Sequence, residues 1–222
     1  MQTPTAESKL AQPTPRRIMV AAAHRLSSLG VPVHWVYGPL HPLPEDDRID
    51  KRGKNPVGKG WQKRPYQDPA ALVEIYQDGY NLGIHTGPVD GTEINLIAWD
   101  LDNDAAIEWA QKGGIPETPL MTLSSRGQHW YYLRPKDLTE NIHTRLHKIK
   151  PEPYLDIDLI ADGTGDGGNC IAAPSTHWTG FRYQEAEPWN RQLIAECPPI
   201  EDRFWKLYRP TAKVIPMPSK ST

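Results

Sequence analysis

The chain has 222 residues, of which 38% are hydrophobic and 23% are charged, as in a soluble globular domain with a sizeable core. Its net charge of −2 excludes a protein that is basic throughout, so any nucleic-acid-binding surface must depend on local clusters of Lys and Arg. Its two cysteines form no CxxC or Cys/His array, which argues against a disulfide framework or a structural zinc site, and no apolar run approaches the ~18 residues of a membrane span.

Residues 1–14 are polar and contain prolines, which is typical of a disordered leader, and residues 210–222 have the composition of a tail or linker. The folded unit is expected to cover residues 15–209. Apolar periodicity and capping residues predict helices over 16–30, 69–78, 104–114 and 200–209. The apolar stripe of the first helix is Met19, Ala22, Ala23, Leu26 and Leu29, and Asp68 and Asn103 are the expected caps of the second and third. Leu72, Ile75 and Tyr76 are expected to form the inner face of the second helix. Strands are predicted over 31–37, 81–87, 93–102, 119–125, 128–135, 154–160, 169–175 and 181–184.

Short connections between the central strands favour antiparallel hairpins, while helices are expected near the start and the end of the chain. The predicted fold class is therefore mixed α/β (α+β), with a mainly antiparallel, RRM-like central sheet flanked by helices. A doubly wound parallel sheet is not expected.

The segment LIAWDLDN, residues 96–103, delivers two acids to the end of an apolar strand. Because alternate residues of a strand share a face, Asp100 and Asp102 lie together, with roughly 7 Å between their Cα atoms. Two adjacent carboxylates repel each other, and a divalent cation such as Mg²⁺ removes that cost. The alternative is a strand end that reaches solvent, with Asp102 starting the turn before the next helix.

A second candidate is SSRGQHWYY, residues 124–132, where a Ser-Ser-Arg-Gly turn precedes an aromatic strand. Ser124, Ser125, Arg126 and the main-chain amides of the turn have the donors that bind a phosphate, and His129 adds another. The alternative is an ordinary hairpin with a partly buried histidine.

A third candidate is the strand YLDIDLI, residues 154–160, which also presents acids, Asp156 and Asp158, on one face. The glycine-rich segment after it, residues 163–168, is not a dinucleotide loop, because such a loop opens a helix and this one leads into the strand NCIAAPS.

The segment KRGKNPVGKGWQKR, residues 51–64, is strongly basic and contains no acid. Its GKNPVGK portion resembles a P-loop, but Gly60 stands where Ser or Thr is required and Pro65 prevents a normal helix, so a nucleotide-hydrolysing P-loop is not expected. The cluster fits the phosphates of a nucleic acid or a nucleotide, and the alternative is a solvated, mobile loop. The candidate nucleic-acid-binding residues are Lys51, Arg52, Lys54, Lys59, Lys63 and Arg64.

These segments occur in a specific order. K-x-P…G-W (54–61) is followed by N-x-G-I-x-T-G (81–87), hhhhDxD, the Ser/Arg/Gly turn with His, hDh, and A-P-S-x-H-x-x-G-x-x-Y (173–183), where h is apolar. The series resembles the archaeo-eukaryotic primase superfamily, and most closely the primase-polymerase domains at the N-termini of phage and plasmid replication proteins. The resemblance covers about residues 16–185, with Ala173 in place of a proline that family members often have.

The resemblance implies a nucleotidyltransferase that makes and extends primers. Asp100, Asp102 and Asp158 would bind two divalent ions, Mg²⁺ or Mn²⁺, with Asp156 as a competitor for the third position. The residues that would contact the incoming nucleotide are Ser124, Ser125, Arg126, His129 and His177, with Arg182 also at a polar position of the last motif.

The implied partners are a single-stranded DNA template, a primer strand and dNTP or NTP, with no membrane, in the cytoplasm of a bacterial host. A second basic cluster at residues 145–150 would help to line the template track, and a helicase domain would follow in a longer chain. Two alternatives stay open: a replication-initiator module that binds DNA without catalysis, and a metal-dependent nuclease.

Overall fold

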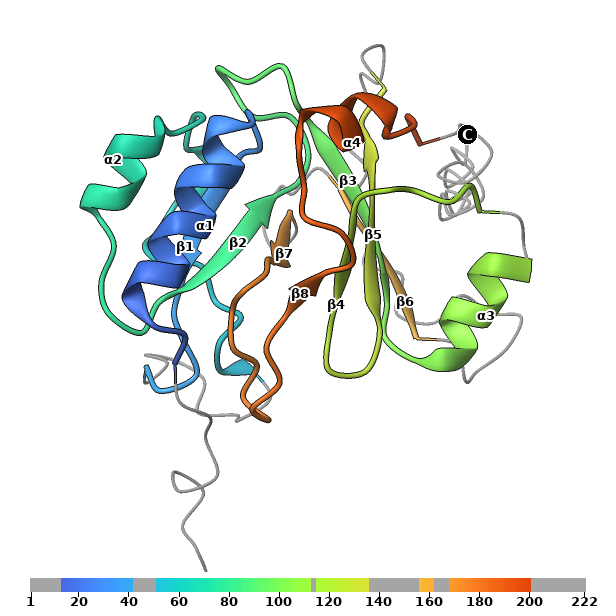
Figure 1. The fold of residues 1–222 in the computed structure, drawn as a ribbon, viewed down its shortest axis with the longest axis horizontal. Coiled ribbons are helices and arrows are strands. Elements are labelled where there is room, and N and C mark those ends of the chain that lie inside the picture. Colours follow the sequence, from blue (N-terminus) through green and yellow to red (C-terminus); the bar gives the residue numbers. More distant parts are fainter. Residues whose placement is uncertain (1–12, 42–50, 113–114, 136–155, 162–167, 201–222) are drawn as a thin grey trace, which may run out of the picture.

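The computed structural model describes residues 13–41, 51–112, 115–135, 156–161 and 168–200. Within these ranges the strands form two antiparallel sheets accompanied by four α-helices, which confirms the predicted fold class while dividing the central sheet in two (Figure 1). The first sheet has the order β1-β2-β7, with bounds Val33–Val36, Asn81–His85 and Asn169–Ile171. The second has the order β6-β3-β5-β4-β8, with bounds Ile157–Ile160, Leu96–Leu101, Gln128–Leu133, Met121–Leu123 and Gln184–Glu185.

Helices α1 (Arg16–Ser28) and α2 (Pro69–Glu74) contact each other and pack on the first sheet (Figure 1). The predicted apolar stripe of α1 buries Met19, Ala23 and Leu26 in this core. In α2, Asp68 caps the helix as expected by accepting a hydrogen bond from the Ala70 amide.

The predicted inner face of α2 is correct for Leu72 and Tyr76 but wrong for Ile75, which is 47% exposed. The helix ends at Glu74, and Ile75 is its C-terminal cap, so the helical periodicity no longer sets the direction of that side chain.

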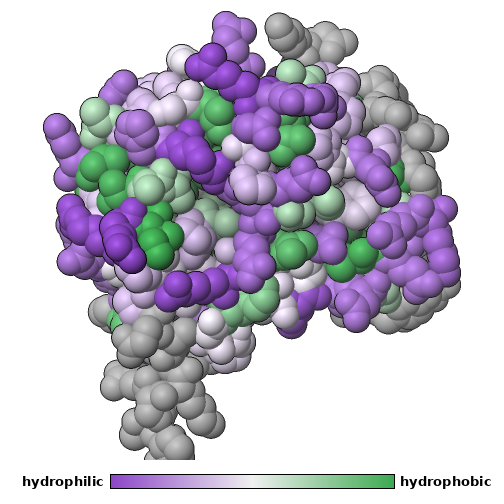
Figure 2. Space-filling view, in the orientation of Figure 1, coloured by the Kyte–Doolittle hydropathy of each residue, from purple (hydrophilic) through white to green (hydrophobic). Residues whose placement is uncertain are grey.

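Figure 2 shows the surface of the molecule from the same side as Figure 1, with hydrophobic side chains in separate patches between polar ones.

Strand β3 is covered on both faces. Ile97, Trp99 and Leu101 pack in a core with α3 (Asp104–Lys112), whose predicted cap Asn103 accepts a hydrogen bond from the Ala106 amide at 2.8 Å. Leu96 and Ala98 point to the opposite face and belong to the core that α1 shares with the first sheet. Because alternate residues of a strand point to the same face, Asp100 lies on the face of Leu96 and Ala98. The burial of these two apolar side chains therefore fixes the direction of Asp100.

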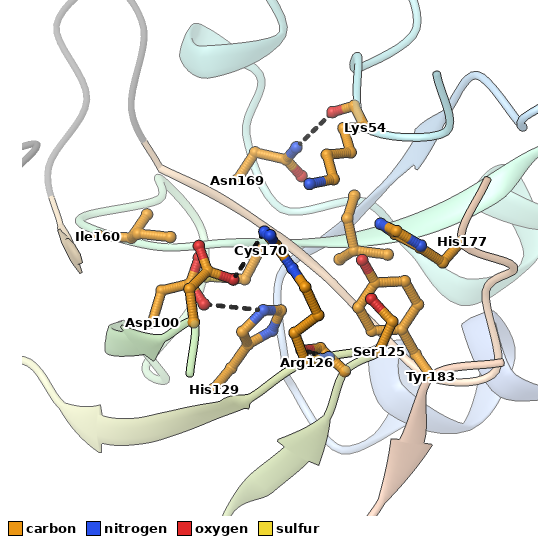
Figure 3. A pocket seen from close by; sticks show the side chains of 13 residues that line it. Lys54, Asp100, Ser125, Arg126, His129, Ile160, Asn169, Cys170, His177 and Tyr183 are labelled. Carbon is orange, nitrogen blue, oxygen red and sulfur yellow. Dashed lines mark hydrogen bonds and ion pairs between the residues drawn. The ribbon is translucent and has the colours of Figure 1, made fainter. Parts of the chain in front are cut away.

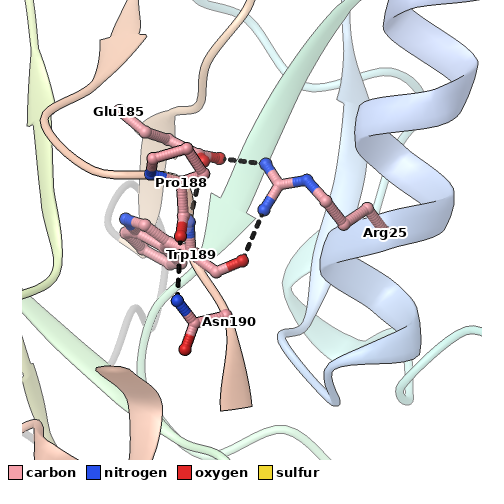
Figure 4. Close-up of polar contacts among 5 residues, drawn as sticks. All are labelled: Arg25, Glu185, Pro188, Trp189 and Asn190. Carbon is pink, nitrogen blue, oxygen red and sulfur yellow. Dashed lines mark hydrogen bonds and ion pairs between the residues drawn. The ribbon is translucent and has the colours of Figure 1, made fainter. Parts of the chain in front are cut away.

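An ion pair and its hydrogen bonds connect α1 to the second sheet (Figure 4). The guanidinium of Arg25 pairs with Glu185 on β8 and donates to the Trp189 carbonyl oxygen at 2.8 Å. The other oxygen of Glu185 accepts the Trp189 amide at 3.0 Å. Helix α4 (Arg191–Glu196) follows directly, capped by Asn190, and was not predicted from the sequence.

Thr14, the last residue of the predicted leader, is buried and donates a hydrogen bond to the Pro174 carbonyl oxygen at 2.7 Å. The rest of the leader, nearly all of the predicted helix over 200–209, the tail and the basic cluster at 145–150 lie outside the described residues. None of the helices described is long and apolar enough to cross a membrane.

Candidate active site

Three neighbouring strands of the second sheet bring Asp158, Asp100 and His129 into one row. Asp100 on β3 is paired with His129 on β5 and with Asp158 on β6. Side chains of directly paired residues point to the same face of a sheet, with Cβ atoms about 4.5–5.5 Å apart. Three candidate residues that are distant in the sequence are therefore neighbours, and Figure 3 shows Asp100 and His129 pointing toward each other.

The carboxyl group of Asp100 lies in a poorly hydrated position, with 18% of the side chain exposed. Its Oδ1 has no hydrogen-bond partner among the residues described, and His129 Nε2 lies 3.3 Å away without the geometry of a hydrogen bond. Burial raises the pKa of Asp100 well above its usual value, and the carboxylates of Asp102 and Asp158 raise it further. The ionised form of Asp100 is therefore disfavoured unless a positive charge lies beside it.

His129 is almost fully buried beside this carboxyl group. Burial lowers the pKa of His129 to about 4, and the positive charge of Lys54 also acts in that direction. The ring is neutral at pH 7, so it offers a hydrogen-bond donor and an acceptor rather than a positive charge.

Asp100, Asp102 and Asp158 have the oxygen donors that Mg²⁺ and Mn²⁺ prefer. A cation next to Asp100 would satisfy its buried Oδ1 and offset the repulsion from its neighbours. No three His, Cys, Asp or Glu side chains in the described ranges are already grouped as a metal site. The fit to a cation therefore depends on donor type and on the unsatisfied oxygen of Asp100.

Asp158 and Asp156 occupy different places relative to the DxD segment. Asp158 is directly opposite Asp100, whereas Asp156 lies just before β6 and accepts the Asp102 amide through its main-chain carbonyl at 2.9 Å. Asp158 also has the larger effect on the pKa of Asp100. The register thus places Asp158 in the same row as Asp100 and Asp156 at the level of Asp102.

The turn between β4 and β5 approaches the end of β3. Ser124 shapes this turn, because its hydroxyl oxygen accepts the Gly127 amide at 3.0 Å and its amide donates to the Gly127 carbonyl at 2.9 Å. Arg126 Nη2 lies 4.0 Å from Asp102 Oδ1 at an exposed position. Ser124, Ser125 and Arg126 line the same pocket as Asp100, Asp102 and His129 (Figure 3).

The basic segment 51–64 is attached to the first sheet, which contradicts the alternative of a solvated, mobile loop. Its main chain pairs with the edge of β1 through the Tyr37 amide to the Asn55 carbonyl and the Val57 amide to the Trp35 carbonyl, both at 2.8 Å. The ring of Trp61 stacks on His34, with 4.6 Å between the centroids.

The six basic residues predicted to bind nucleic acid differ in exposure and in their relation to the pocket. Lys54 lines the pocket with the acids, whereas Lys59 and Lys63 are exposed. Lys51, Arg52 and Arg64 are partly buried. The sequence alone could not show which of these side chains point into the pocket, because a basic run without helical or strand periodicity does not indicate where each side chain points.

His177 lines the pocket on the side of Lys54 (Figure 3). Burial lowers the pKa of His177 to about 4, and the charges of Lys54 and Arg126 contribute. Its Nδ1 accepts the Thr179 amide at 3.3 Å, so the neutral ring carries its proton on Nε2. Arg182, the other polar position of this motif, is not among the pocket residues.

The family model for the N-terminal domain of bifunctional DNA primase/polymerases, Prim-Pol, matches residues 22–200. This range includes every candidate catalytic and nucleotide-binding residue and most of the chain. The chain belongs to the Prim-Pol family. Among curated proteins, none matches the chain.

A DNA primase/polymerase-type function follows from membership of the Prim-Pol family. Asn169, Cys170 and Tyr183 also line the pocket of this Prim-Pol chain, and none of them was predicted as a site residue. Asn81, which does not line the pocket, is a residue whose importance could have been predicted from the sequence. Asparagine is rare in strands, and a buried asparagine such as Asn81 needs several hydrogen-bond partners.

The stability of this Prim-Pol domain is expected to fall in mildly acidic solution because of His34. Burial lowers the pKa of His34 to about 3, while the unfolded chain protonates near its ordinary value of 6.5. Since the unfolded state then binds more protons below pH 6.5, His34 alone should lower the free energy of unfolding by about 2 kcal/mol between pH 7 and pH 5.

Chemical denaturation across this range should show a smaller pH dependence for His34→Gln than for the wild type. His24→Gln, at an exposed position of α1, is the matched control. Equal slopes for the wild type and His34→Gln would contradict the assignment to His34.

Proposed function

We propose that this Prim-Pol domain is a template-dependent nucleotidyltransferase that synthesises and extends primers with two divalent cations, Mg²⁺ or Mn²⁺. The observation that carries the proposal is the row of Asp158, Asp100 and His129 across three strands, next to the turn with Arg126. Asp100, Asp102 and Asp158 would hold the cations. When bound, the cations would lower the pKa of the primer 3′-hydroxyl and neutralise charge on the phosphates.

In the proposed reaction, the 3′-hydroxyl oxygen of the primer bonds to the α-phosphorus of the nucleotide. The bond from that phosphorus to the bridging oxygen breaks, pyrophosphate leaves with its electron pair, and the hydroxyl proton passes to water. Arg126 supplies positive charge from the exposed turn, and neutral His129 can donate a hydrogen bond to a phosphate oxygen. The protein thus contributes mainly alignment and charge compensation.

The single-stranded template and the primer are proposed to approach along the exposed lysines of segment 51–64, Lys59 and Lys63. A role in phage or plasmid replication inside a bacterial cell, with a helicase domain further along a longer chain, follows only from the resemblance in sequence. It belongs to the same proposal.

A primer-extension assay tests this function. The purified domain is incubated with a labelled primer on a single-stranded template, with dNTP or NTP, and with Mg²⁺, Mn²⁺ or EDTA. Extension that requires a cation and follows the template sequence is the expected result. Binding without extension would instead favour the initiator module, and degradation of the DNA without added nucleotide would favour a nuclease.

A further inference from the structure

Asn81 joins the two segments that carry Lys54 and His177. It is 1% exposed at the start of β2. Its Nδ2 donates to the Gly53 carbonyl at 3.0 Å and to the Thr176 carbonyl at 2.9 Å, and its Oδ1 accepts the Thr176 amide at 3.0 Å. Both donor hydrogens of the buried amide are used, so one side chain fixes the main chain directly before Lys54 and directly before His177.

Asn169 fixes Lys54 from the other side. Its Nδ2 donates to the Lys54 carbonyl at 2.9 Å (Figure 3). Its Oδ1 lies 2.9 Å from His34 Nε2. Gly83 on β2 makes room for this pair, because a Cβ there would lie 2.4 Å from Asn169 Oδ1. The main chain at Lys54 is therefore held by two asparagines from two strands of the first sheet.

The side chain of Lys54 points into the pocket (Figure 3). Arg126 enters the same pocket from the opposite side, from the turn between β4 and β5. Lys54 thus lines one pocket together with Asp100, His129 and His177, so its ammonium group lies on the side of the histidines and of the acids alike. Lys59 and Lys63, by contrast, are exposed.

We propose that Lys54 binds a phosphate of the incoming nucleoside triphosphate rather than the DNA backbone, and that Asn81 and Asn169 are positioning residues for it. The inference rests on the proposed function and adds the ligand of this lysine. Inside the pocket, Lys54 and Arg126 would provide positive charge on two sides of one anion, where an ammonium group acts as a point charge. A template strand would meet the exposed lysines first.

Steady-state kinetics and DNA binding distinguish the two ligands. In Lys54→Ala, the KM for dNTP should rise about tenfold to a hundredfold, the usual effect of losing a charged hydrogen bond, while the Kd for primer-template changes by less than about twofold. Lys54→Arg should recover most of the affinity. Lys59→Ala, in the same segment, should show the opposite pattern, with weaker DNA binding and an unchanged KM for dNTP.

Weaker DNA binding by Lys54→Ala with an unchanged KM for dNTP would overturn the inference. Titration calorimetry with dATP and Mn²⁺, without DNA, measures nucleotide binding alone, so it tests the role of Lys54 separately from the proposed function. If the wild type binds dATP more tightly than Lys54→Ala but extends no primer, the proposed function fails and the assignment of Lys54 stands. If the wild type extends primers and the two proteins bind dATP equally, the assignment fails alone.

The positioning role of Asn169 needs a measurement that general destabilisation does not mimic. Asn169→Ala should raise the KM for dNTP in the wild-type background and have little further effect in Lys54→Ala, because residues acting as one unit are not additive. Equal effects in both backgrounds would show that Asn169 does not act through Lys54. Asn169→Ala is preferred to a substitution of Asn81, whose three buried hydrogen bonds also hold β2 to two segments.

Discussion

Asp100→Asn is expected to abolish nucleotide incorporation and, at the same time, to raise the melting temperature of the cation-free protein. The activity is lost because the central carboxylate of the row is removed, and a decrease of at least about 10²-fold is expected for the loss of one such charge. The stability rises because Asp100 is buried, lacks a hydrogen bond to Oδ1 and is repelled by Asp102 and Asp158. Residues that serve function at the expense of stability behave in this way.

Thermal denaturation with and without MnCl₂, together with primer extension, measures both effects. Mn²⁺ should stabilise the wild type and have little effect on Asp100→Asn. Asp104→Asn, at the exposed first turn of α3, is the matched control and should keep both activity and the response to Mn²⁺. Full activity of Asp100→Asn would refute the role of Asp100 as a cation ligand. A melting temperature lower than that of the cation-free wild type would refute the repulsion of Asp100 by Asp102 and Asp158.

Gly127→Ala is expected to destabilise the domain by about 3 kcal/mol and to impair incorporation, although Gly127 is not itself a binding residue. A Cβ at this position would lie 1.8 Å from the Leu101 carbonyl oxygen and 3.0 Å from Asp102 Cα. These are main-chain atoms that cannot rotate away, so the turn between β4 and β5 would have to move from the end of β3. Arg126 would move with it, away from Asp102.

Urea denaturation and the KM for dNTP report on the two parts of this effect. Gly60→Ala is a suitable control, since no atom lies within 4 Å of the added Cβ and only the positive φ of 68° opposes it. That strain should cost about 1–2 kcal/mol and leave the pocket unchanged. If Gly127→Ala were as stable as Gly60→Ala and kept a normal KM for dNTP, the close contact of the turn with the end of β3 would not be needed for stability or for activity.

Much of the fold and of the candidate site could be predicted from the sequence because the signals were local. The alternation in LIAWDLD predicted a buried strand with Asp100 on one face, and Asn103 and Asp68 predicted the starts of two helices. Two sheets in place of one could not be foreseen, because strand pairing is set by contacts between distant segments.

The choice between Asp156 and Asp158 shows the same limit. Both acids share a face of their strand, so alternation alone cannot distinguish them. Only the register with β3 places Asp158 opposite Asp100 and the Asp156 carbonyl opposite the Asp102 amide. Lys54 is a similar case: its main chain is held by hydrogen bonds from Asn81 to the preceding Gly53, 28 positions away, and from Asn169 to Lys54 itself, 115 positions away.

The attachment of segment 51–64 to β1 also has a consequence for self-association. β1 is the outer strand of the first sheet, and an outer strand with free amides and carbonyls can recruit a strand from another molecule. Here the Tyr37 amide and the Trp35 carbonyl are already bonded to the segment, and Pro56, which forms a bridge with Val36, has no amide hydrogen to offer. The segment that brings Lys54 to the pocket therefore also occupies this edge of the sheet, and its exposed Lys59, two residues after Val57, adds a charge that disfavours pairing with another strand.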